Sequence, residues 1–236
     1  MHSTRLKVRF SRLHVAREAS ARGFTLVELL VAMVIVSVVM AAAIGVFRMQ
    51  THTVKAQENR LDAQEYARSV LDIMVREIRN AGYNPLSATS GANCAGGSAG
   101  SPGVVTATAT SFRFTYDYRG TNSTDPPDGA CDDADEDITY TLDTSCSGAS
   151  IGNITRNGSS NPLTDCNVTS LDIRYFKQDG TELSRPVSGA TNLAAIQRVQ
   201  ITLTVQSKNP DPLFGGGQLN ATMTSNADLR NRGLPS

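Results

Sequence analysis

Residues 22–47 read RGFTLVELLVAMVIVSVVMAAAIGVF, and this stretch decides the fold of the chain. From residue 29 to residue 47 there are 19 consecutive uncharged residues, among which Ser37 is the only obviously polar side chain. As an α-helix, residues 24–47 would be about 36 Å long, whereas the hydrocarbon core of a bilayer is about 30 Å thick. We therefore expect a helix over residues 24–47 that spans a membrane.

The charges around this segment are distributed unevenly. The 236-residue chain has 22 Lys and Arg residues and 22 Asp and Glu residues, so its net charge is zero. Its first 23 residues carry six basic side chains and one acidic side chain, so this N-terminal segment has a net charge of +5 and the rest of the chain a net charge of −5. Because basic residues flank membrane segments on the cytoplasmic side, we expect a cytoplasmic N-terminus and an exported C-terminal body.

Glu28 is the one charged residue within residues 24–47. A carboxylate at the centre of a bilayer costs about 2.5–3.5 kcal/mol, so a plain membrane anchor leaves this residue unexplained. A cleaved secretory signal also fits poorly, because its apolar core is only about 7–15 residues long. The position of Glu28 indicates a cationic partner inside the membrane or an assembly.

The run RGFTLVELLVAM, residues 22–33, resembles the N-terminal motif of type IV pilins and type II secretion pseudopilins. This resemblance implies that a prepilin peptidase cleaves after Gly23 and methylates the new amino terminus at Phe24. It also implies that Glu28 pairs with the terminal ammonium of a neighbouring subunit and so sets the stagger between helices. The 23-residue leader is longer than many in the family, and Gly45 lies where many major pilins have a helix-kinking proline.

The helical pattern continues through residues 48–81 with an amphipathic character. Its apolar positions recur mostly three, four or seven residues apart, which is the spacing of one helix face: Val54, Leu61, Ala67, Val70, Leu71, Met74 and Ile78. Gly82 and Pro85 then end the helix. We expect one helix over residues 24–81, whose second half offers an apolar stripe to a sheet.

Residues 82–236 have the pattern of a β-rich head. Residues 87–103 are rich in Ser, Gly and Ala and indicate a loop, and alternating apolar residues then predict strands at 112–118, 138–142, 168–175 and 199–205. No helical pattern intervenes between these strands, which favours an antiparallel sheet. The expected fold class is α+β and pilin-like, with a long N-terminal helix packed on a C-terminal antiparallel β-sheet.

Four further segments resemble the PilW family of minor pilins: VREIRNAGYNP at 75–85, DEDITYTL at 135–142, RVQITLTVQS at 198–207 and LRNRGL at 229–234. This resemblance implies a subunit that joins other minor pilins and the major pilin at an inner-membrane assembly platform, in membrane lipid before assembly and at the cell surface afterwards. The implied organisation is a cleaved leader at 1–23, a membrane or filament-core helix at 24–47, an amphipathic continuation at 48–81 and a periplasmic head at 82–236. A J-type pseudopilin of type II secretion is the alternative, and the role of the pilus in motility, adhesion or DNA uptake stays open.

The four cysteines lie in the exported part of the chain: Cys94, Cys131, Cys146 and Cys166. An oxidising compartment favours two disulfides, for which three connectivities exist. We expect the sequential pairing, Cys94 with Cys131 and Cys146 with Cys166, because both loops are short. Zinc is the rival interpretation, but the sequence has no CxxC motif and no nearby histidine.

An acidic run precedes the expected strand at 138–142. Asp133, Asp135 and Asp137 alternate, which is a weak pattern for calcium, and a solvated acidic loop is the simpler interpretation. The last histidine is His52, so catalytic sites that need an imidazole are excluded from the body, and we identify no catalytic residues and no required cofactor. The chain has no concentrated basic patch after Arg79, so we expect no nucleic-acid partner. A membrane-anchored binding domain or carboxylate enzyme that keeps residues 1–23 is a further alternative.

Overall fold

The structure is a computed structural model that describes residues 23–85, 94, 103–120, 122, 125–131, 133, 135–146, 151–210 and 217–231. The chain forms two compact units, Met1–Met49 and Gln50–Ser236. Most of the expected leader therefore lies outside the described residues, and only Gly23 of it is seen. The expected division at residues 1–23, 24–47, 48–81 and 82–236 stays a prediction.

Helix α1, Leu26–Ile78, runs through 53 residues and belongs to both units. It begins two residues after the expected start and ends three residues before the expected end at residue 81. Residues 79–82 form a turn in which Gly82 has a φ of 79° and donates its N–H to the carbonyl of Thr115 at 2.9 Å. A glycine accepts this left-handed conformation without a Cβ clash, which is why the helix stops here.

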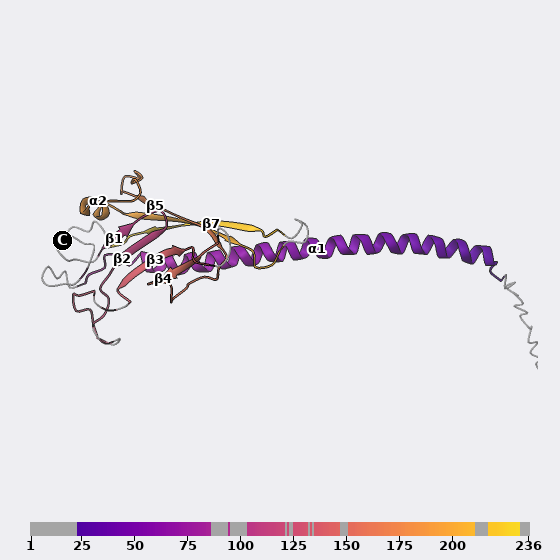
Figure 1. Cartoon of the computed structure of the whole chain (residues 1–236), viewed down its shortest axis with the longest axis horizontal. Helices are drawn as coiled ribbons and strands as arrows, with labels where there is room; N and C mark the ends of the chain where they lie inside the picture. Colours follow the sequence, from indigo (N-terminus) through magenta and orange to yellow (C-terminus); the bar gives the residue numbers. More distant parts are fainter. Residues whose placement is uncertain are drawn as a thin grey trace, which may run out of the picture. The chain divides into compact units, whose positions relative to one another are not determined.

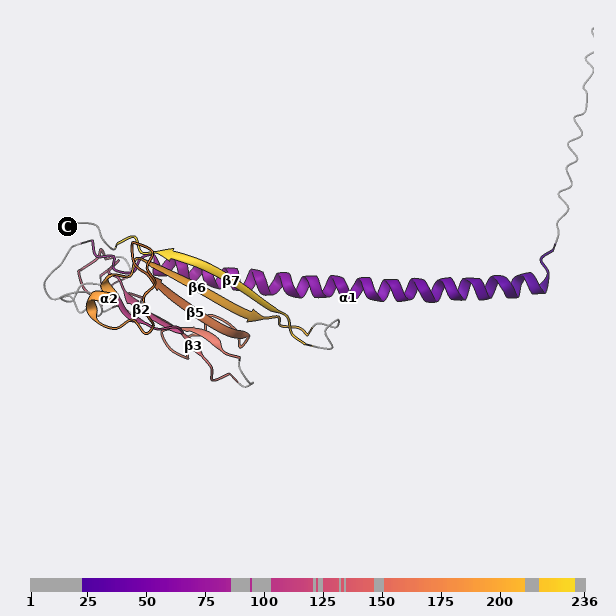
Figure 2. The same ribbon diagram turned by 90° about the horizontal axis from the view of Figure 1, so that it is seen from above.

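The described residues of the head form seven strands and one short helix. These are β1 Val104–Ala107, β2 Ser111–Thr115, β3 Asp137–Asp143, β4 Asn153–Arg156, β5 Val168–Phe176, α2 Ala190–Ala194, β6 Arg198–Gln206 and β7 Asn220–Asp228. They form two antiparallel sheets, one in the order β1-β2-β3-β4 and one in the order β5-β6-β7. Figures 1 and 2 show both sheets beside the C-terminal part of α1.

The strand predictions were correct in part. Strands β2, β3, β5 and β6 coincide with the four expected segments, although β2 ends at Thr115 and not at residue 118. Strands β1, β4 and β7 were missed, because β1 and β4 have only four residues each and β7 reads NATMTSNAD without a clear apolar alternation. The single expected sheet is in fact two sheets.

One hydrophobic core joins α1 to both sheets, which confirms the expected α+β class. The stripe of α1 that enters it consists of Ala63, Ala67, Val70, Leu71, Met74, Val75 and Ile78, all buried. Phe112 of β2 and Tyr175 of β5 meet across the two sheets with ring centroids 5.5 Å apart. The Tyr175 hydroxyl also donates to the carbonyl of Thr108 at 2.7 Å, so its polar end is satisfied within the core.

Two disulfides close loops of the head. Cys94 is bonded to Cys131 with a Cα–Cα distance of 4.8 Å, and Cys146 to Cys166 with a Cα–Cα distance of 5.8 Å. The structure thus has the sequential pairing. Every cysteine of the chain is used, which leaves no thiol for zinc.

Candidate functional site

The candidate site begins at the N-terminal end of α1, where Thr25 and Glu28 hold each other. Glu28 donates its backbone N–H to Oγ1 of Thr25 at 3.2 Å, and Thr25 donates its own backbone N–H to Oε2 of Glu28 at 3.3 Å. This reciprocal arrangement is a capping box, with Thr25 at the N-cap and the glutamate at the third helical position. The signal, Thr-x-x-Glu before an apolar run, was present in the sequence, and the sequence analysis missed it.

The capping box gives Glu28 a partner inside its own chain. The Thr25 hydroxyl also lies 3.4 Å from the same carboxylate oxygen, as a third contact in this small network. Two of these contacts run from neutral donors of Thr25 to the carboxylate, and the remaining one joins the Glu28 N–H to the Thr25 hydroxyl at an exposed helix end. No ion pair reaches Glu28 from the described part of the chain.

The helix beyond Glu28 is apolar on every side. Each described residue of the first unit, residues 23–49, is exposed, and the large apolar side chains among them are 48–84% exposed. Ser37 turns its hydroxyl back to the carbonyl of Val34 at 2.8 Å, so the one polar side chain of the run is satisfied within the helix. By length and composition, α1 is able to cross a membrane.

Gly23 and Phe24 precede the helix as extended chain. Phe24 is 84% exposed, and a side chain placed on Gly23 would meet nothing within 4 Å. No described residue thus obstructs either side of the bond between them. The roles expected for Gly23, Phe24 and Glu28 remain predictions at this point.

The acidic run before β3 forms ion pairs with arginines. Arg119 lies with its Nη2 3.1 Å from Oδ2 of Asp135 and its Nε 3.8 Å from Oδ2 of Asp133. Asp137 instead forms a two-point pair with Arg113, whose Nε donates at 2.9 Å. The three carboxylates expected as weak calcium ligands are therefore divided between two cations. Among the residues that the structure describes, no group of three or more acidic, His or Cys side chains is arranged to hold a metal ion.

Two further carboxyl groups near this run are fully buried, which the sequence did not reveal. Asp117 accepts the Gly129 N–H at 2.9 Å, and Glu136 accepts the backbone N–H groups of Tyr118 and Arg119 at 3.0 and 3.1 Å. Burial raises the pKa of both carboxyls, and the amide hydrogen bonds only partly offset that rise. Acidic runs are usually solvated, so nothing in the sequence distinguished these two side chains from their exposed neighbours.

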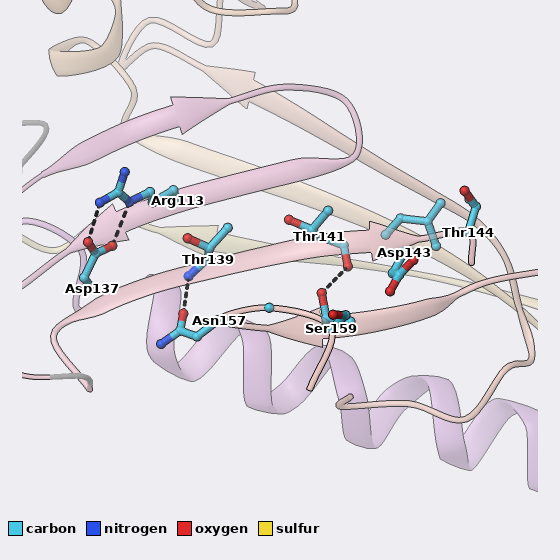
Figure 3. A pocket seen from close by; sticks show the side chains of 11 residues that line it. Arg113, Asp137, Thr139, Thr141, Asp143, Thr144, Asn157 and Ser159 are labelled. Carbon is cyan, nitrogen blue, oxygen red and sulfur yellow. Dashed lines mark hydrogen bonds and ion pairs between the residues drawn. The ribbon is translucent and has the colours of Figure 1, made fainter. Parts of the chain in front are cut away.

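An open polar hollow lies on the outer face of β2, β3 and β4 (Figure 3). The Arg113–Asp137 ion pair lines one end of it, and Asn157 accepts the backbone N–H of Thr139 through Oδ1 at 2.7 Å. The remaining lining is mainly hydroxyl groups, as Figure 3 shows. Arg113 and Asp137 form an ion pair with each other, Asp143 accepts the backbone N–H of Ser145, and no described nucleophile in the lining is held by a neighbouring base.

Comparison with known proteins identifies a sequence motif around the N-terminal end of α1. Residues 19–44 match the prokaryotic N-terminal methylation motif. The matched segment contains Gly23, Phe24, the capping box and most of the apolar run. The matched residues that the structure describes, 23–44, are all exposed.

The rest of the chain is less well matched. No curated protein matches the sequence. Among solved structures, the chain is similar to a type IV-like pilin from Thermus thermophilus at 9% sequence identity and a TM-score of 0.44, over 71% of this chain and 95% of that one.

Proposed function

We propose that this protein is a minor pilin, a structural subunit of a type IV pilus that is cleaved between Gly23 and Phe24 and methylated at Phe24. The observation that carries the proposal is the methylation motif at residues 19–44. It coincides with an exposed glycine–aromatic bond directly before an apolar helix. A prepilin peptidase is the enzyme class that acts on such a motif.

The exposed apolar half of α1 is the assembly element in this proposal. In the monomer its side chains require lipid, because burying apolar surface away from water is strongly favourable. In a filament the same side chains pack against the helices of other subunits. The inner membrane therefore holds the subunit before assembly, and the filament core offers its helix a second apolar environment. The partners are other minor pilins, the major pilin and the inner-membrane assembly platform.

Glu28 supplies the register of assembly. Its carboxylate is the one charge between Gly23 and Phe47, and its hydrogen-bond donors among the described residues are neutral. The ammonium of Phe24 from a neighbouring subunit neutralises it and removes the cost of holding a charge among apolar side chains. Because both groups occupy fixed places on their helices, their pairing sets one stagger between subunits.

The head supports a structural role and not an enzymatic one. Its core is formed by a helix stripe and two sheets, its cysteines are all in disulfides, and its outer hollow is lined by the Arg113–Asp137 ion pair, the Asp143 carboxylate and several hydroxyl groups. Minor pilins of the PilW family are the group that the segments at 75–85, 135–142, 198–207 and 229–234 favour. We place the processed head in the periplasm and later at the pilus surface.

The experiment that tests the function is a gene deletion scored in two ways in the same cells: sheared surface pili, and proteins released to the medium. Loss of pili with normal secretion, restored by the intact gene but not by Gly23→Val, supports the minor pilin. The matched control is Gly45→Ala, a glycine of the same unit that the peptidase does not use and whose added methyl meets nothing within 4 Å.

Two other results contradict the proposal in distinguishable ways. Normal pili with exported proteins trapped in the periplasm would assign the chain to a type II secretion pseudopilus, as a J-type subunit. Full function of Gly23→Val with residues 1–23 retained would mean that the chain is a membrane-anchored protein of another class.

A further inference from the structure

Strand β7 lies at the margin of the three-stranded sheet, and its free edge has a regular pattern. All nine residues of β7 pair with β6 without a register shift. Beyond the two ends of the strand, Ser207 donates to the carbonyl of Leu219 and Leu229 donates to the carbonyl of Gln197. In an antiparallel ladder the hydrogen-bonded pairs alternate, so the odd-numbered residues 219–229 direct their backbone groups toward β6. The N–H and C=O groups of the even-numbered residues therefore point away from it: Asn220, Thr222, Thr224, Asn226 and Asp228.

The other marginal strands of the two sheets are all covered by neighbouring segments. Ala107 of β1 accepts the Val187 N–H at 2.8 Å, and Ile154 of β4 accepts the Leu163 N–H at 2.7 Å. Tyr175 of β5 accepts the Leu183 N–H at 2.8 Å. Within the described part of the chain, no hydrogen bond reaches the outward backbone groups of β7. Figure 2 shows β7 along one margin of the strands.

The sequence of β7, NATMTSNAD, lacks the usual protection of a free edge. Natural proteins guard long edges with Lys, Pro, a bulge or an inward-pointing charge, because an open edge pairs with other chains. β7 has none of these, and its one charged residue, Asp228, is exposed at the last position of the strand. The five residues whose backbone groups point away from β6 are all exposed. Such a strand suits an assembly in which the edge is covered.

A groove beside β7 adds side-chain recognition to this edge. Met223 of β7 and Leu61 of α1 form its apolar part, and Gln64, Glu65 and Arg68 form its polar side. Leu61 is 62% exposed although it belongs to the half of α1 that packs on the head. In strand addition, main-chain hydrogen bonds provide affinity and pockets for alternate side chains provide specificity. The groove is placed to receive the side chains on one face of an added strand.

We propose that the free edge of β7 binds an extended strand of a different pilus subunit, one that alternates apolar residues toward Leu61 and Met223 with polar residues on the outer face. This inference rests on the proposed function, in which the chain assembles with other pilus subunits. The outward N–H and C=O groups of Thr222, Thr224 and Asn226 form the central ladder of the interface. An added β-strand satisfies this row of alternating donors and acceptors with direct main-chain hydrogen bonds in place of water.

A second copy of this chain fits the edge less well. A closed two-fold dimer through β7 needs antiparallel pairing, because in a parallel two-fold pair each outward N–H would face its own equivalent. Figures 1 and 2 show β7 running lengthwise beside the part of α1 that packs on the head. Antiparallel pairing would thus point the N-terminal ends of the two α1 segments in opposite directions, whereas both copies must enter the same membrane from one side.

The test uses full-length protein in the producing bacterium and two substitutions at one position. Thr224→Pro removes an outward N–H that donates nothing to β6, and proline is tolerated on an edge strand. Thr224→Val is the matched control, because it loses the same contact with the Thr202 hydroxyl at 3.0 Å but keeps the N–H. We expect Thr224→Pro to lower the amount of this chain in sheared filaments at least tenfold and Thr224→Val to leave it near the wild-type level. Equal thermal unfolding of the two variants in detergent shows that both fold.

Hydrogen exchange on the wild-type protein provides a measurement that needs no variant. The amides of Thr222, Thr224 and Asn226 should exchange at least tenfold more slowly in sheared filaments than in the detergent-extracted chain. Wild-type incorporation of Thr224→Pro, equal loss of both variants, or unprotected edge amides in filaments would overturn the strand interface. A disulfide-linked homodimer of Thr224→Cys in membranes would overturn the choice of a different subunit. If the wild-type chain itself is absent from filaments, the proposed function fails, which is a separate result.

Discussion

The hydroxyl of Tyr140 on β3 donates a hydrogen bond to Oε2 of Glu77 on α1, and the same oxygen lies 3.1 Å from Nε of Arg156 on β4. This single carboxylate oxygen therefore connects the last turns of the helix to two strands of the four-stranded sheet. The side chains of Glu77 and Arg156 are 25% and 20% exposed, so the pair is partly shielded from water. Burial and the Glu77 charge raise the pKa of Tyr140, which keeps its hydroxyl a donor at any physiological pH.

Removing the Tyr140 hydroxyl should weaken the attachment of the helix to this sheet. We expect Tyr140→Phe to lower the free energy of unfolding by about 1.5–3 kcal/mol, the range for a hydrogen bond to a charged group. Chemical denaturation of the full-length protein in detergent measures this loss. Tyr118→Phe is the control, because Tyr118 is 44% exposed and its loss should change stability little. Equal effects of the two substitutions would contradict a special role for the Tyr140–Glu77 contact.

The buried carboxyls predict a stability that falls as the pH rises through the mildly acidic range. Burial raises the pKa of Asp117 and Glu136 in the folded chain, and the nearby charges of Asp128 and Asp133 act in the same direction. Between the ordinary pKa of a carboxyl and the raised value, the folded state holds more protons than the unfolded state. The free energy of unfolding therefore decreases with pH across that window.

Asp117→Asn tests this prediction directly. An asparagine Oδ1 still accepts the Gly129 N–H and carries no buried charge. We expect a higher melting temperature at pH 7 and a flatter dependence of stability on pH than in the wild type. Asp143→Asn is the contrast, because the hydrogen bonds from Ser145 lower the pKa of that exposed carboxyl, so its replacement should not flatten the dependence. A lower melting temperature for Asp117→Asn at pH 7 would show that the charge is compensated in solution.

Glu28→Gln should separate helix capping from subunit register. Glutamine also serves at the third position of a capping box, so it can accept the Thr25 N–H while losing the negative charge. Under the proposed function we expect normal cleavage after Gly23, unchanged helix content and at least a tenfold loss of the chain from filaments. Immunoblots of membrane and sheared fractions measure both steps. The control is Thr25→Ser, which keeps the cap and the charge, and wild-type incorporation of Glu28→Gln would refute the ion-pair register.

The two disulfides should differ in their contribution to stability. Cys94 and Cys131 are 37 residues apart and Cys146 and Cys166 are 20 apart, so the first closes the longer loop. Loop-closure entropy in the unfolded chain predicts losses of about 4 and about 3 kcal/mol when each pair is replaced by serines. Denaturation of the two double-serine variants measures both values. A larger loss for the pair at 146 and 166 would mean that native contacts, and not loop length, dominate.

The extent and polarity of α1 could be derived from local sequence, because a helix depends on periodicity and on its end signals. The steps between Ala67, Val70, Leu71 and Met74 identified the buried stripe, and Gly82 marked the end to within a few residues. The methylation motif was equally local, since cleavage and membrane insertion are read along the chain. Strands β2, β3, β5 and β6 were found because apolar alternation over five or more residues is a strong signal.

What the sequence determined by itself is thus everything that depends on neighbours along the chain: the apolar helix, Glu28 near its N-terminal end and the methylation motif at residues 19–44. The tertiary structure alone decided which strands share a sheet, which carboxyls are buried and which edge is left open. Strand pairing, the burial of Asp117 and the free edge of β7 all depend on residues far apart in sequence. Hydrogen-bond partners and desolvation are properties of the folded arrangement, so no local pattern encodes them.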